Sequence, residues 1–179
     1  PIDLKPRLTR LSAELKLWKD LRANEACSIS KVDTAKQIVY GVVLDPYQID
    51  SQDDWIPPSH VEQTAHKYLT ESRTVGFRHS KQASAQVVES SLVEYPTKQD
   101  YDNAMVNAEH KAYRRPFGDD IVHSGSWILA VHITDPDLWA MVIDGTLNAF
   151  SIGGTGLRTD IDPSLAMPEV TFVDLVPQA

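Results

Sequence analysis

Hydrophobic residues recur at helical and strand spacings along much of the chain, and these spacings predict its elements. Between residues 7 and 23, apolar side chains recur every three or four positions, as in an amphipathic helix. They are Leu8, Leu11, Leu15, Trp18 and Leu21. Charged residues of both signs fill much of the remainder, so we expect this helix to lie on the domain or on a neighbouring subunit. Binding to a membrane surface is the alternative.

Further segments rich in apolar or β-branched residues predict strands. They are 37–44, 74–79, 85–95, 126–133, the stretch that contains Ser151, and 169–176. Helices are predicted from Pro57-Pro58-Ser59 to about Ser72, and from Thr134-Asp135-Pro136 to a stop at Gly145. Several strands with few, scattered helices predict an α+β fold, in which a mixed, mainly antiparallel sheet or barrel is flanked by helices.

Two regions differ from this pattern and define the expected organisation. Residues 1–35 form an N-terminal amphipathic helical segment, and residues 36–179 form one folded domain. Within that domain, residues 96–124 are charged and aromatic, with helix-forming residues from Lys98 to Tyr113 followed by Pro116 and Gly118. We therefore expect a helical insertion between strands at about 96–124.

Composition narrows the class of protein. The 179 residues are 42% hydrophobic and 23% charged, with a formal net charge of −8. A general nucleic-acid binder needs a concentrated basic face, and the nearest basic cluster is only Lys111, Arg114 and Arg115. The single Cys27 excludes an intrachain disulfide and fits a reducing compartment. Since no apolar run approaches about 20 residues and the first twenty residues are charged throughout, we expect a cytosolic protein that does not enter membranes.

Ser151 is the candidate nucleophile. It ends an apolar run and precedes Gly153 and Gly154. A serine hydroxyl needs a base to take its proton, and residues without side chains let donor groups approach the substrate oxygen. The alternative interpretation is a strand that simply turns at the two glycines.

His79 is the leading candidate for the base, because it lies at a predicted strand end between Arg78 and Ser80. His132, in an alternating strand, is a second candidate. A third group must orient the histidine. Glu169 could do so if the last strand lies beside the one that bears Ser151, and Asp54 and Asp50 are the alternatives.

Metal chemistry is a further alternative. His60 and His66 are six positions apart on a predicted helix, a poor spacing for one metal ion. A metal-dependent hydrolase would instead have to use His79 and His132. We expect no metal and no cofactor.

Taken in order, four stretches resemble the phage prohead (capsid maturation) serine proteases, in particular those encoded by prophages. They are Val42–Pro46 with Asp50–Ile56, Val75–His79 with Val87–Ser90, Gly125–Ile128 with Phe150–Gly154, and Glu169–Pro177. The resemblance covers nearly all of the chain after residue 37. It departs from the family pattern at Asp53, where a glycine is usual, and at Thr171, where a serine is usual.

The resemblance implies a fold like that of herpesvirus assemblin, a small barrel-like sheet surrounded by helices. It implies a serine endopeptidase with Ser151 as nucleophile, His79 as base and Glu169, or alternatively Asp54, as third member. The substrates would be phage scaffold and major capsid protein, and the enzyme itself, inside the assembling prohead in the host cytoplasm. Such enzymes associate, so a homo-oligomer is expected. The alternative is a catalytically inactive assembly or scaffold-binding protein with the same fold.

Overall fold

The computed structural model describes residues 28–48, 56–77, 81–82, 84–106, 112–155 and 169–176. Apart from Gln48, they belong to one compact unit formed by Ala26–Tyr47 and Ile56–Ala179. The predicted helix at 7–23 and Cys27 lie outside the described residues. None of the helices in the described part is long and apolar enough to cross a membrane.

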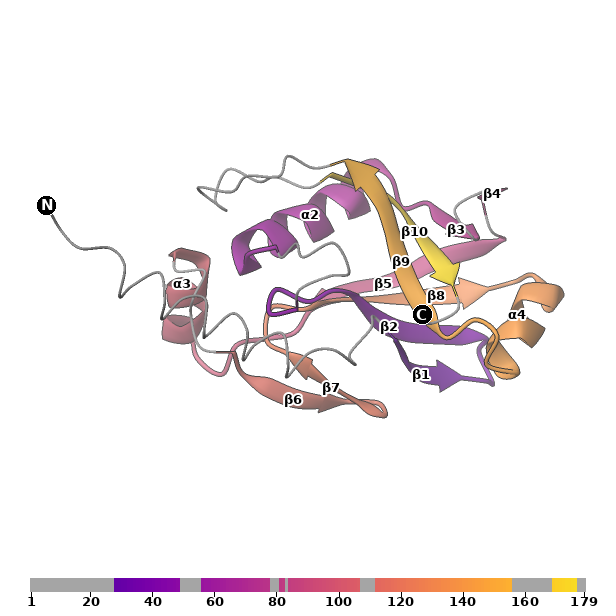
Figure 1. Cartoon of the computed structure of the whole chain (residues 1–179), viewed down its shortest axis with the longest axis horizontal. Helices are drawn as coiled ribbons and strands as arrows, with labels where there is room; N and C mark the ends of the chain where they lie inside the picture. The colour runs from indigo at the N-terminus through magenta and orange to yellow at the C-terminus, as the bar shows by residue number, and fades with distance from the viewer. Residues whose placement is uncertain are drawn as a thin grey trace, which may run out of the picture. The chain divides into compact units, whose positions relative to one another are not determined.

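The described residues form three helices and ten strands, labelled as in Figure 1. The helices are α2 (Pro58–Glu71), α3 (Lys98–Val106) and α4 (Pro136–Ile143). The strands are β1 (Ile29–Asp33), β2 (Ile38–Leu44), β3 (Val75–Phe77), β4 (Lys81–Gln82), β5 (Ala85–Leu92), β6 (Arg114–Phe117), β7 (Asp120–His123), β8 (Trp127–Ile133), β9 (Ala149–Thr155) and β10 (Glu169–Val176).

The strands build two four-stranded sheets and one hairpin. Sheet order is β1-β2-β8-β5 in the first and β4-β3-β10-β9 in the second, and β6 pairs with β7. All pairs are antiparallel except β3 with β10, which run parallel. The α+β class with mainly antiparallel sheets is therefore confirmed.

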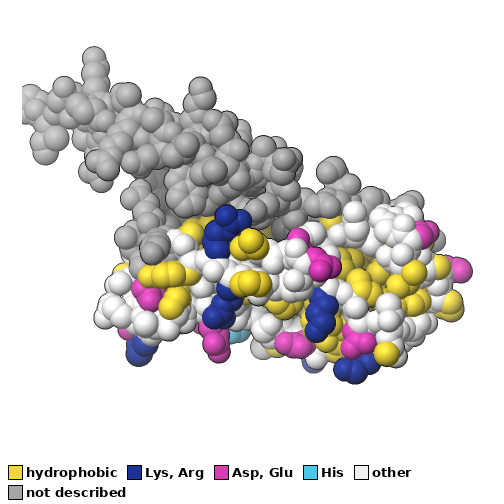
Figure 2. All heavy atoms as spheres, turned by 90° about the horizontal axis from the view of Figure 1, so that it is seen from below, with side chains coloured by type: hydrophobic (Ala, Val, Ile, Leu, Met, Phe, Trp, Pro, Cys, Tyr) yellow, Lys and Arg dark blue, Asp and Glu magenta, His cyan; other side chains and the backbone are white. Residues whose placement is uncertain are grey.

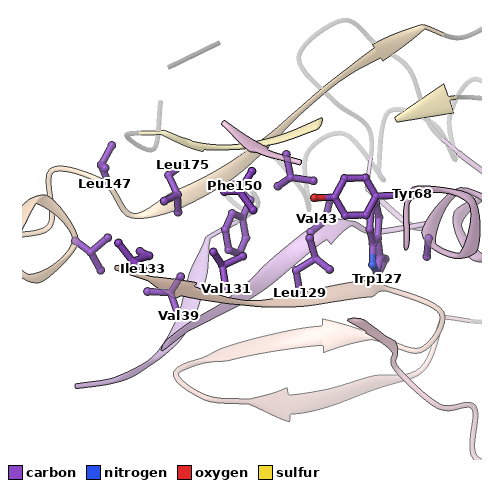
Figure 3. Close-up of a cluster of buried hydrophobic side chains, with 14 of the residues drawn as sticks. Val39, Val43, Tyr68, Trp127, Leu129, Val131, Ile133, Leu147, Phe150 and Leu175 are labelled. Atoms are coloured by element: carbon purple, nitrogen blue, oxygen red, sulfur yellow. The ribbon is translucent and has the colours of Figure 1, made fainter. Parts of the chain in front are cut away.

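The core lies between the two sheets, with α2 closing one end. Figure 3 shows β9 above β2 and β8, with the buried side chains between them. The sheet of β2 and β8 contributes, among others, Val39, Leu129, Val131 and Ile133, and β9 and β10 contribute Phe150, Val173 and Leu175. From α2, Tyr68 packs its ring edge-on against Trp127, with the ring centroids 5.2 Å apart.

The barrel-like closure expected from the resemblance is corrected by this arrangement. A barrel needs a continuous ladder of hydrogen bonds around its circumference. In the described part of the chain, the two sheets are joined between β1 and β9 only by an isolated bridge, Ser28 with Ala149, next to the bond from the Ile29 N–H to the Asn148 carbonyl (2.7 Å). The described strands therefore form two open sheets packed face to face.

Gly41 allows this close approach of the sheets. A Cβ atom at that position would lie 2.6 Å from the Ser28 carbonyl oxygen and 2.8 Å from the Phe150 ring. Both distances are shorter than real Cβ contacts, so a side chain here would push β1 or β9 away. A residue without a Cβ is needed where these backbones meet.

The strong periodic segments are confirmed with small differences in their ends. The strand predicted at 37–44 is β2, and the one predicted at 126–133 is β8. The helix expected from Pro57-Pro58-Ser59 is α2, and the last strand, β10, spans Glu169–Val176 as predicted. β1 was not predicted, and it pairs with β2, so residues 29–33 fold together with the strands after residue 36.

The insertion at 96–124 is only partly helical. α3 ends at Val106, and the predicted helix to Tyr113 is wrong at its end, because Arg114 begins the β6–β7 hairpin. The hairpin turns at Gly118, whose φ of 59° favours glycine. The Asp119 N–H donates to the Ser30 carbonyl (2.9 Å), which anchors the turn on β1.

The N-cap of α4 provides a stability prediction. The Asp135 carboxylate accepts hydrogen bonds from the Asp137 and Leu138 N–H groups. We expect Asp135→Ala to lower the free energy of unfolding by about 1 kcal/mol, because these donors lose their acceptor. Asp135→Asn keeps a side-chain oxygen, so we expect its free energy of unfolding to fall by only a few tenths of about 1 kcal/mol. Urea unfolding of both variants checks this, and equal losses would contradict the capping role.

Candidate active site

Ser151 lies in β9 on the face that points away from the core. Its neighbours Phe150 and Ile152 belong to or pack against the core cluster, and side chains alternate between the two faces of a strand. The Ser151 residue is partly buried. The alternative of a turn at the glycines is wrong, because Gly153 pairs with Phe172 and Gly154 with Val170, and β9 continues to Thr155.

Asp174 lies directly opposite Ser151 on the neighbouring strand. β10 pairs with β9 so that Asp174 stands against Ser151, and with β3 so that it also stands against Gly76. Val173 and Leu175 on either side are fully buried in the core, so Asp174 faces the same side as Ser151. Asp174 is only 1% exposed. The fold thus places a buried carboxylate beside the candidate nucleophile.

This carboxylate is absent from the sequence-based candidates. The available signal was a charged residue within an apolar strand, Val173-Asp174-Leu175, which is unusual where both faces are covered. Its partner across the sheet could not be known without the register of β10 on β9.

Glu169 fulfils one condition of its prediction but lies away from Ser151 along the strands. β10 does run beside β9, as the sequence argument required. Its register pairs Glu169 with Thr155, four residues along β9 from Ser151. At about 3.3 Å per residue, the two positions are about 13 Å apart along the strand. The role predicted for Glu169 stays a prediction.

His79, Asp54 and Asp50 lie outside the described residues. β3 ends at Phe77, which pairs with Leu175, the residue after Asp174. His79 follows two positions later in the sequence.

His132, the second candidate base, is not brought to Ser151. It lies in β8 opposite Ile38 and Gln86, between the core residues Val131 and Ile133. Its side chain therefore lies on the face of sheet β1-β2-β8-β5 that points away from the core. Ser151 belongs to the other sheet, on the opposite side of the core. Among the described residues, no group of three potential ligands could hold a metal ion.

A second buried polar pair lies elsewhere in the fold. His123 Nδ1 lies 2.7 Å from Asp45 Oδ2, and the Tyr47 N–H donates to Asp45 Oδ1 (2.8 Å). Both side chains of the pair are less than 10% exposed. The pair joins the end of β7 to the residue that follows β2, so it fixes the hairpin on the sheet. It was not predicted, because its members are 78 positions apart.

A surface cavity of about 300 Å³ lies away from Ser151. It is formed by α2, α3 and the residues after β5, and Glu62, Tyr95 and Tyr101 are among its lining residues. On the face of the molecule shown in Figure 2, the described basic and acidic side chains are mixed with hydrophobic ones. The residues that line this cavity do not include Ser151 or Asp174.

Comparison with known proteins identifies relatives of this chain. Two curated relatives are both from Bacillus subtilis (strain 168). The chain is 26% identical over 120 residues to "Phage-like element PBSX protein XkdF", covering 67% of this chain and 37% of that protein. It is 25% identical over 128 residues to "Uncharacterized protein YqbD", covering 71% of this chain and 34% of that protein. The chain thus spans about a third of the length of these relatives.

No solved structure matches the chain. A family model does match, over residues 25–160, and its description is "Putative phage serine protease XkdF". The match includes β9 with Ser151 and β3, and it covers well over half of the chain. The chain therefore belongs to the phage serine protease family of XkdF.

Proposed function

We propose that this chain is a serine endopeptidase of phage head assembly, with Ser151 as its nucleophile. The single observation that carries the proposal is the position of Ser151, on the outer face of β9 with a buried carboxylate directly opposite. A serine held on a paired strand has a fixed position, and a neighbouring carboxylate favours the positive charge that develops on a base during attack. Membership of a phage serine protease family supports the same assignment.

The proposed reaction proceeds through an acyl-enzyme. Ser151 Oγ attacks the carbonyl carbon of the scissile peptide bond while its proton passes to His79. The C–N bond then breaks, and the protonated His79 gives that proton to the leaving amine. A water molecule next loses a proton to His79 and attacks the ester carbon. The carboxylic acid product leaves, and the proton returns to Ser151 Oγ.

The proposed substrates are phage scaffold and major capsid protein, and the enzyme itself. The reaction would take place inside the assembling prohead in the host cytoplasm, in a homo-oligomer. The resemblance to prohead proteases supports this part of the proposal, as does the phage-like element named for the first relative.

A non-catalytic assembly protein is the second candidate. It is favoured by the segment between β5 and β8, where α3 and the β6–β7 hairpin add surface to the domain. These elements are not part of the sheet that contains Ser151. In this case Ser151 would be an ordinary strand residue, and the added elements would bind scaffold.

Labelling with a fluorophosphonate probe distinguishes the two candidates. We expect the full chain to be labelled on Ser151, located by mass spectrometry of peptides. Labelling should be lost in Ser151→Ala and in His79→Ala, because the probe reacts only with an activated serine. Ser84→Ala removes an exposed serine outside the site and is the matched control, which should label like the wild type. A folded wild-type protein that stays unlabelled, or full labelling of His79→Ala, would favour the non-catalytic role.

A further inference from the structure

We infer that Asp174 is the carboxylate that positions the catalytic base and stabilises its charged form. This inference rests on the proposed serine protease function. Asp174 lies beyond the end of the family match at residue 160, and the inference gives it the role predicted for Glu169 or Asp54. Asp174 is a positioning residue, because it acts on the base and not on the substrate.

The register of sheet β4-β3-β10-β9 supports the inference first. Residues directly opposite each other on antiparallel strands have Cα atoms about 4.5–5.5 Å apart and side chains on the same face. Ser151 and Asp174 form such a pair. A histidine ring that accepts the Ser151 proton must lie about 3 Å from Oγ. The Asp174 carboxylate, on the adjacent strand, is the acceptor that we propose for the N–H of the other ring nitrogen.

On the third strand of this sheet, β3, the residue in register with Ser151 and Asp174 has no side chain. Gly76 stands opposite Asp174 on the side away from Ser151. No Cβ from β3 therefore occupies the face beside this carboxylate. β3 is also the strand from which the chain leads to His79, three positions after Gly76. The sheet thus brings together the nucleophile, the carboxylate and the strand that precedes the expected base.

Burial gives the carboxylate its electrostatic effect. At 1% exposure, the Asp174 charge is little screened by water, so it stabilises a nearby imidazolium more than a solvated acid would. Keeping a carboxylate in such a place is costly unless charged or hydrogen-bonding groups compensate for it. The neighbouring residues Val173 and Leu175 are also fully buried, but both are apolar, so Asp174 differs from its neighbours in charge and not in burial.

Other acids among the described residues are less suitable. Asp45 is buried to a similar degree, but His123 and the Tyr47 N–H hold its two oxygens. Glu169 is about 13 Å along the strands from Ser151 at the usual rise per residue. Asp174 needs no proton of its own in this role. It accepts a hydrogen bond from the ring N–H while the Ser151 proton moves to the other ring nitrogen.

The test measures the rate of fluorophosphonate labelling of the full chain as a function of pH. We expect Asp174→Asn to lower the labelling rate constant on the order of a thousandfold or more, because the ring loses its orienting acceptor. We also expect the apparent pKa of the rate profile to fall in Asp174→Asn, since the protonated base is no longer stabilised. A purely structural role for Asp174 would not move this apparent pKa.

Matched variants separate the possible outcomes. Asp45→Asn removes another buried carboxylate, and it should lower stability while leaving the pH profile of labelling unchanged. If Asp174→Asn is folded and labels like the wild type, or if Glu169→Gln alone shifts the profile, the inference is overturned and the proposed function stands. If the wild type itself does not label, the proposed function fails.

A measurement on the wild type covers the case in which Asp174→Asn does not fold. The side-chain carboxyl carbon of Asp174 is followed by NMR before and after the probe modifies Ser151. We expect its resonance to shift on modification, with the Asp45 carboxyl resonance unchanged as the internal control. An unchanged Asp174 resonance would contradict a position beside the reacting group.

Discussion

Ser151→Ala is expected to leave phage scaffold and major capsid protein uncut when it is coexpressed with them. Serine and base act as one unit, so removal of the hydroxyl should lower the cleavage rate on the order of a millionfold. The effect should be specific to activity. Ser151 points away from the core, and the packing of Phe150 and Ile152 does not depend on its hydroxyl. The measurement is the appearance of cleaved products on denaturing gels over time.

The control is Ser84→Ala, which changes an exposed serine of the turn before β5 and should cleave like the wild type. Thermal unfolding of both variants is expected to follow that of the wild type. Normal processing by a folded Ser151→Ala protein would end the protease assignment.

Trp127→Ala is expected to have the largest effect on stability. Trp127 is fully buried, its ring meets Tyr68 edge-on, and its Nε1–H donates to Ser90 Oγ (3.0 Å). Truncation leaves a cavity at the point where α2 meets β8 and removes the donor to Ser90. We expect the free energy of unfolding to fall by about 3–5 kcal/mol, measured by urea unfolding.

Trp139→Ala is the matched control, because Trp139 is only partly buried at the edge of the same core. Its loss should cost clearly less than that of Trp127. A similar loss for both tryptophans would mean that the α2–β8 contact is not the centre of stability.

Much of the fold could be predicted because local signals and tertiary structure agree there. β8 is apolar except for His132 and is buried on nearly its whole length. α4 begins at an Asp-Pro pair and ends before Gly145, whose φ of 79° stops a helix. β10 was predicted with its observed ends. In such segments the pattern alone determines the element.

The remaining features depend on contacts between distant residues. The β6–β7 hairpin is held on β1 through Ser30, which lies 89 positions before Asp119, so no local pattern predicted it. The same holds for the candidate site. Ser151 could be predicted as a candidate because it precedes two glycines. The position of Asp174 beside it depends on the register of β10 on β9, which has a bulge between Val170 and Phe172. A one-residue shift of that register would have placed Asp174 on the other face.

Gly41 links the rate of the proposed reaction to a sheet that supplies none of its reacting groups. The ring of Phe150 rests on Gly41, and Phe150 is the residue before Ser151. A methyl group at position 41 is expected to displace Phe150 and with it Ser151, the proposed nucleophile, although Ser151 itself is unchanged. Natural variation in this family should therefore be compared at this glycine as well as at the serine 110 positions later, since a change at either position is expected to lower the proposed activity.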